Sequence, residues 1–61
     1  KESELEMKHL EIGYHLGIQL IRICGWDAAV EALKDAGNRA EARGIFRALR
    51  ENANGRSLAF D

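Results

Sequence analysis

The fold is decided by residues 4–24, which read ELEMKHLEIGYHLGIQLIRIC. On a helical wheel, the apolar side chains of this segment fall on two opposite sides. The first side carries Leu5, Ile12, Leu16, Leu20 and Ile23, and the second carries Met7, Leu10, Tyr14, Ile18 and Ile21. A surface helix needs one apolar stripe, so a helix that is apolar nearly all round is expected to be covered on more than one side.

The rest of the chain is too short to cover both sides. Between residue 24 and the tail it offers only a few large apolar side chains: Trp26, Val30, Leu33, Ile45, Phe46 and Leu49. We expect these to cover the first side. The second side (Met7, Leu10, Tyr14, Ile18 and Ile21) is then the predicted partner interface.

Length, charge and cysteine content narrow the class of protein. A chain of 61 residues forms one domain at most, and a core of that size is marginal without help from a metal, disulfides or association. Cys24 is the single cysteine, which excludes an intrachain disulfide and is typical of a reducing compartment. The net charge of −1 gives no global attraction to nucleic acid or to anionic membranes. Because the acidic start lacks a signal-peptide pattern and polar residues interrupt the apolar stretch, a cytoplasmic protein without a membrane span is expected.

Local signals predict three helices. Ser3 and Glu6 form a capping box that starts the first helix, which is expected to end at Ile23 or Cys24. Gly13 and Gly17 lie inside it, where each costs about 1 kcal/mol relative to alanine. A packing reason is therefore expected, and a close helix–helix crossing in a bundle is the interpretation we favour.

The second and third helices are short. Asp27 is predicted to cap a helix over 28–36, with Ala29, Ala32, Leu33 and Ala36 on its inner face and Gly37 as a left-handed C-cap residue. Asn38 and Glu41 form a second capping box. The third helix then presents one apolar stripe (Ala42, Ile45, Phe46, Leu49 and Ala53) and ends at Asn54-Gly55. Residues 1–55 are the expected domain and 56–61 a flexible tail, from which Leu58 and Phe60 are able to dock.

Signals for catalysis or metal binding are sparse. His9 and His15 lie about 120° apart on the wheel and cannot share a metal on one straight helix. Glu11 and His15 do share a face, but they supply an incomplete ligand set. No group is identifiable that would orient a Cys24–histidine pair for nucleophilic chemistry. We therefore predict no enzyme, no metal and no cofactor.

A row of arginines follows the third helix. Arg39, Arg43, Arg47 and Arg50 fall within about 80° of arc, beside the apolar stripe. Four guanidinium groups suit phosphates, carboxylates or an acidic helix. The alternative interpretation is a solvated edge, with arginine stems covering the core. A helix-turn-helix reading would place this row on a recognition helix, although the chain is acidic overall and amide base readers are missing from that face.

Two families share spacings with this chain. Trp26, Gly37, Glu41, Ala42 and Phe46 resemble one tetratricopeptide repeat over residues 23–52, which implies a helical pair that stacks on further repeats and binds peptides. Val30 stands where that family has a small residue, and Ala48 comes one place early. Cys24-Gly25-Trp26, Ala32-Leu33 and Gly37-Asn38 resemble a ubiquitin-associated three-helix domain, whose loop normally reads Met-Gly-Phe or Met-Gly-Tyr and whose first helix is shorter.

Together these patterns predict an all-α chain in which one long helix packs against a short antiparallel helical hairpin, in an oligomer that is most simply a two-fold dimer. The expected function is a protein–protein interaction or oligomerisation module, such as a small regulator. The partner is a second copy or a helix of another protein. The alternative is a small dimeric nucleic-acid-binding regulator that uses the arginine row.

Overall fold

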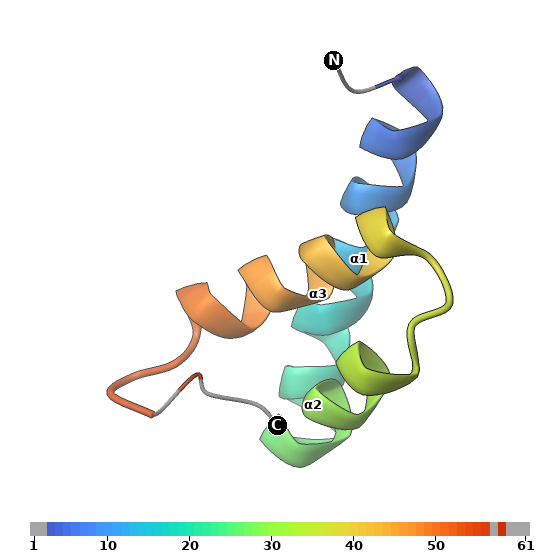
Figure 1. The fold of residues 1–61 in the computed structure, drawn as a ribbon. Helices are drawn as coiled ribbons and strands as arrows, with labels where there is room; N and C mark the ends of the chain where they lie inside the picture. Colours follow the sequence, from blue (N-terminus) through green and yellow to red (C-terminus); the bar gives the residue numbers. More distant parts are fainter. Residues whose placement is uncertain (1–2, 57, 59–61) are drawn as a thin grey trace.

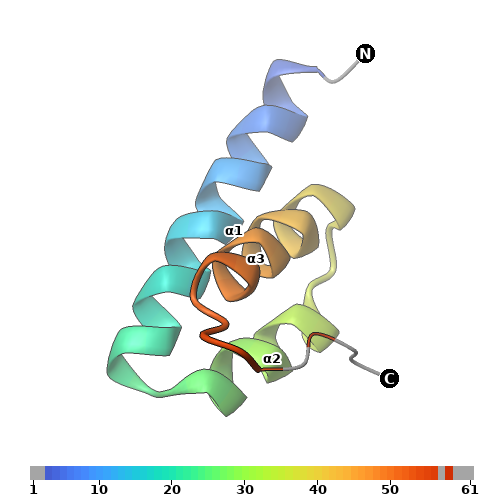
Figure 2. The ribbon, with the colours of Figure 1, turned by 90° about the vertical axis from the view of Figure 1, so that its left-hand side faces the viewer.

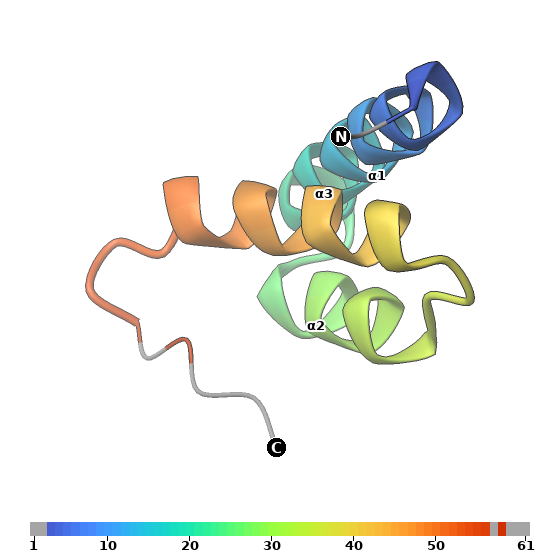
Figure 3. The ribbon, with the colours of Figure 1, turned by 45° about the horizontal axis from the view of Figure 1, so that its top comes forward.

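The computed structural model describes residues 3–56 and 58, and these form three helices: α1 (Glu4–Ile23), α2 (Trp26–Asp35) and α3 (Arg39–Glu51) (Figure 1). The all-α prediction is confirmed. Figure 3 shows α3 lying across α1, with α2 packed beside both at the end of α1 where the chain turns. Phe60 lies outside the described residues.

The first helix begins as the sequence predicts. Ser3 Oγ accepts a hydrogen bond from the Glu6 backbone N–H at 3.2 Å, and Glu6 Oε1 accepts one from the Ser3 N–H at 3.0 Å. This reciprocal pair satisfies two N–H groups of the first turn, and the Glu4 and Glu6 carboxylates lie at the positive end of the helix dipole. The helix ends at Ile23, with Cys24 as its C-cap residue.

The prediction for the second helix was wrong at both ends. Gly25, with φ of 104°, is the N-cap residue, so α2 begins at Trp26 and Asp27 falls inside its first turn. This positive-φ backbone is open to glycine at little cost, and no side-chain hydrogen bond caps the start of the helix. At the other end, Ala36 adopts an extended conformation (φ −60°, ψ 125°) that leads out of the helix, so Gly37 does not take the predicted left-handed role.

Asparagine side chains mark both ends of the third helix. Asn38 Oδ1 accepts from the Ala40 and Glu41 N–H groups at 2.8 and 3.2 Å, which is the asparagine half of the predicted capping box. Asn52 Nδ2 donates to the Ala48 carbonyl at 2.8 Å, and the helix ends at Glu51. The helix is therefore shorter than predicted. Asn54 and Gly55, both with positive φ, form the turn that follows it.

Glycine allows α1 and α3 to approach closely. A Cβ added to Gly13 would overlap the Glu41 carbonyl, and one added to Gly17 would lie 2.8 Å from the Ala48 Cβ. From the other helix, a Cβ on Gly44 would overlap the Leu10 carbonyl and lie 2.6 Å from the Tyr14 nitrogen. The predicted close crossing is confirmed, and its partner is a helix of the same chain.

The core lies between the three helices. Ala29, Ile45 and Leu49 form its buried centre, with half-buried side chains packed around it: Leu16, Leu20, Ile21, Trp26, Val30, Ala32, Leu33, Ala36 and Leu58. The predicted inner face of the second helix is thereby confirmed. On α3 the small residues Ala40, Gly44 and Ala48 are buried as well, whereas Ala42, Phe46 and Ala53 of the predicted stripe are half-buried.

The beginning of the predicted tail also contacts the body. Leu58 packs against the core, and the Arg56 guanidinium lies 4.9 Å from the centroid of the Trp26 ring. Trp26 is half-buried beneath that contact.

Candidate interaction surfaces

One side of α1 is left uncovered by the other residues that the structure describes. Leu5, Ile12 and Ile23 are 64%, 50% and 80% exposed, and we call these three residues the outer edge. The expectation that the chain's own hairpin covers the first side of this helix was wrong for these three residues, whereas Leu16 and Leu20 of the same side do pack against the core. The contact with α3 runs along Gly13 and Gly17, which lie about 100° further round the helix. In Figure 2, α2 and α3 lie on one side of α1, and no described segment lies on the opposite side.

The five residues of the predicted partner interface do not form one open face. Met7 is 58% exposed, whereas Leu10, Tyr14, Ile18 and Ile21 are half-buried. The Tyr14 hydroxyl donates a hydrogen bond to Glu51 of α3, and Ile21 packs against the core. These four residues already receive partial cover from their own chain, so the outer edge is the more exposed apolar surface of α1.

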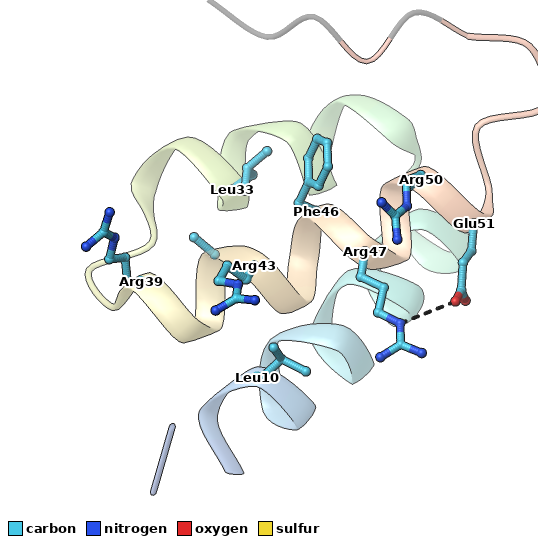
Figure 4. A pocket seen from close by; sticks show the side chains of 9 residues that line it. Leu10, Leu33, Arg39, Arg43, Phe46, Arg47, Arg50 and Glu51 are labelled. Atoms are coloured by element: carbon cyan, nitrogen blue, oxygen red, sulfur yellow. Dashed lines mark hydrogen bonds and ion pairs between the residues drawn. The ribbon is translucent and has the colours of Figure 1, made fainter. Parts of the chain in front are cut away.

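The predicted arginine row borders a groove. Leu10 of α1, Leu33 of α2, and Ala42 and Phe46 of α3 contribute apolar surface to it. The polar lining comes from α3 and consists of Arg39, Arg43, Arg47, Arg50 and Glu51 (Figure 4). All four arginines are exposed, so the structure brings the complete predicted row to one rim. A partner that fits this groove would carry negative charge beside an apolar surface.

Tyr14, Arg47 and Glu51 are linked at one end of this groove. The Tyr14 hydroxyl donates to Glu51 Oε1 at 2.5 Å, and Arg47 Nε lies 3.4 Å from Glu51 Oε2. The Arg47 guanidinium also lies 5.6 Å from the centroid of the Tyr14 ring. The hydrogen bond from Tyr14, helped by Arg47, lowers the pKa of Glu51, and the same bond to a carboxylate raises the pKa of Tyr14. Part of the arginine charge is therefore already neutralised within the chain.

The His, Cys, Asp and Glu side chains that the structure describes are not grouped as a metal site requires. Within residues 3–56 and 58, no group of three or more His, Cys, Asp and Glu side chains is placed to hold a metal ion. His15 lies edge-on to the Tyr14 ring, with 5.9 Å between the ring centroids. Cys24 is a free, exposed thiol at the end of α1.

Comparison with known proteins identifies no relative: the chain matches no family model, no curated protein and no solved structure. The tetratricopeptide and ubiquitin-associated patterns remain similarities of spacing. Among the helices described, none combines the length and the apolar character needed to cross a membrane.

Sequence reasoning missed two features of these surfaces. Gly44 was not linked to Gly13 and Gly17, although Ala40, Gly44 and Ala48 form a row of small residues four apart. Such a row is a signal for close helix approach, because residues four apart share one face. The outer edge was also missed because small residues were given too little weight. The side of α1 that packs against α3 is set by the glycines of α1 and not by its largest apolar residues.

Proposed function

We propose that this chain is a protein–protein interaction module that associates with a second copy of itself through α1. The observation that supports the proposal is the outer edge, where three large aliphatic side chains are at least half exposed on one helix. Apolar residues scattered singly on a surface are ordinary. Three on one side of one helix, in a chain with few buried large side chains, favour a binding surface.

Association would also compensate for the small size of the core. Ile45 and Leu49 are the largest fully buried side chains described, and the other buried apolar residues are alanines. Burying a Leu or Ile side chain is worth about 1.5–3 kcal/mol. Covering the outer edge on two copies would therefore add substantially to the stability of each, before the entropy of association is subtracted. In this proposal α2 and α3 form the antiparallel hairpin that supports α1 from behind.

The test is the dependence of thermal stability on protein concentration. If folding is linked to self-association, the midpoint of thermal unfolding rises as concentration increases, because mass action favours the associated state. Ile23→Ser removes a side chain that is 80% exposed, so the protomer should fold while the concentration dependence weakens. Lys34→Ser, at an exposed position on α2, serves as the control and should retain it.

A midpoint that stays constant across a thousand-fold range of concentration would contradict self-association. In that case a helix of a different protein becomes the candidate partner, and co-purification from a source extract would be the next step.

A second candidate function rests on the arginine row. Arg39, Arg43, Arg47 and Arg50 are exposed along one rim, which suits the phosphates of a nucleic acid. If the row binds nucleic acid, the double variant Arg43→Ala and Arg47→Ala should weaken binding to DNA or RNA. The slope of log K against log salt should become shallower by about 2, because each lost phosphate contact removes about 1 from it. Lack of binding at low salt by the native chain would reject this function.

A further inference from the structure

The outer edge belongs to a longer, regularly spaced line of residues on α1. From Leu5, alternating steps of four and three residues reach His9, Ile12, Leu16, Gln19 and Ile23. This is the spacing of the a and d positions of a heptad repeat, which keeps side chains on one seam along a helix. Leu5, Ile12, Gln19 and Ile23 are exposed, and His9 and Leu16 are half-buried. We call these six residues the seam.

The seam matches itself when one copy is reversed. Leu5 and Ile23 lie equally far from residue 14 in opposite directions, and so do His9 and Gln19, and Ile12 and Leu16. A two-fold axis passing beside residue 14 would therefore set each of these residues opposite its counterpart on the second copy. Apolar side chains then face apolar ones, and the imidazole faces an amide with which it can hydrogen-bond. A polar pair of this kind within an apolar seam fixes register.

Charge favours the antiparallel direction over the parallel one. The first turn of α1 carries Glu4 and Glu6, and its last turn carries Arg22. In an antiparallel pair, the acidic first turn of each helix lies beside the basic last turn of the other copy, and the helix dipoles oppose. A parallel pair would instead place both acidic first turns side by side, where like charges repel.

The rest of the fold leaves room for this pairing. Helix α3 contacts α1 along Gly13 and Gly17. Leu16 of the seam packs against the core of its own chain, whereas Leu5, Ile12 and Ile23 stay exposed. The side of α1 opposite both helices is open along its length (Figure 2). The outer edge borders this open side, about 100° round α1 from Gly13 and Gly17, so a second α1 would approach from the flank of the α1–α3 contact.

We propose that α1 pairs with α1 of a second copy as an antiparallel two-helix coiled coil, centred beside residue 14 and built on the seam. This inference rests on the proposed function and specifies its geometry. It replaces the partner interface predicted from the sequence with the opposite apolar side of the same helix.

The native cysteine allows a direct test of direction. Cys24 is exposed and lies ten residues beyond residue 14, and each residue advances a helix by about 1.5 Å. In the antiparallel pair the two Cys24 positions are therefore about 30 Å apart. In a parallel pair they are separated by about the interaxial distance, roughly 10 Å. A nitroxide spin label on Cys24 reports this distance by pulsed electron paramagnetic resonance on the full chain.

The outcomes distinguish a failure of the antiparallel geometry from a failure of self-association. A distance near the longer value supports the antiparallel seam. A short distance in a protein of dimer mass overturns the seam geometry and leaves self-association standing. A single-chain mass at every concentration overturns both.

Matched variants identify the side of α1 that is used. Ile12→Glu introduces two carboxylates at the centre of the proposed interface and should raise the dimer dissociation constant by about 100-fold or more. Met7→Glu makes the same charge change at a similarly exposed position of α1 outside the seam, and should change the constant by less than about threefold. Circular dichroism checks that both variants remain helical. Dissociation by Met7→Glu but not by Ile12→Glu would overturn the seam in favour of the face that contains Met7.

Discussion

A hydrogen bond joins the middle of α1 to the end of α3, and the pKa shifts that it causes predict a pH-dependent stability. The Tyr14 hydroxyl donates to Glu51, which lowers the pKa of the carboxyl group and raises the pKa of the phenol. For Glu51, the resulting stability is present above the unfolded pKa and is lost as pH falls through the lower folded value. For Tyr14, it is present below the unfolded pKa and is lost as pH rises through the raised folded value.

Glu51→Gln tests the acidic side of this linkage. The amide keeps the shape of the side chain and can still accept from Tyr14, but it carries no charge. We expect the variant to be less stable than the native chain at pH 7, with a difference that shrinks as pH falls below about 4, near the ordinary glutamate pKa. Urea unfolding at pH 7, 5 and 3 measures the difference in the free energy of unfolding between the variant and the native chain. Glu31→Gln, at an exposed position on α2, is the control, and identical pH profiles for the two variants would contradict the linkage.

The crossing of α1 and α3 is the contact that positions both candidate surfaces. It was foreseen in part, because glycines inside a helix need a packing reason. Gly13 has one in the backbone of α3, and Gly17 has one in the Ala48 side chain of that helix. The start of α1 was also predictable from Ser3 and Glu6, whose capping interaction is local in sequence. The start of α2 was not, because Asp27 is a good cap by residue type, whereas Gly25 acts through its backbone angle.

Gly44→Ala tests the crossing. In an ordinary helix interior this substitution stabilises by about 1 kcal/mol. Here the added Cβ would overlap the Leu10 carbonyl, which belongs to a helix backbone that cannot rotate away, so the helices must separate. We expect a net loss of about 1–3 kcal/mol in the free energy of unfolding.

Gly37→Ala is the matched control for this crossing. No atom lies within 4 Å of the Cβ position at Gly37 and its φ is not positive, so it should be neutral or slightly stabilising. Chemical denaturation of both variants gives the comparison. Equal stability of Gly44→Ala and the native chain would show that the crossing is looser than described.

For the molecule as a whole, the sequence predicted the helical class and the excess of apolar surface on α1, but not which side of α1 stays open. Helical-wheel reasoning weighs side chains by their apolar size, whereas the intramolecular contact is centred on residues that have no side chain. Once the glycines set the direction of α3, the flanks with Leu10 and Leu16 gain partial cover. Leu5, Ile12 and Ile23 are left outside it, and that arrangement depends on long-range packing that no local pattern specifies.

The arginine row, in contrast to the outer edge, could be predicted from local sequence spacing. Its four members share a face by helical spacing alone, so the sequence was sufficient to bring them together. Its neutralising partner Glu51 follows Arg47 by four residues on the same helix, so this ion pair is local as well and the spacing predicts it. The bond from Tyr14 to Glu51 is not predictable in this way, because it forms only when α3 packs across α1.

Sedimentation equilibrium of the unmodified chain over a wide range of concentrations is the most direct test of association through α1. The expected result is a molar mass that rises with concentration from the 6.8 kDa of one chain to a plateau at twice that value. A folded, helical protein that keeps the mass of a single chain at the highest concentration would contradict it.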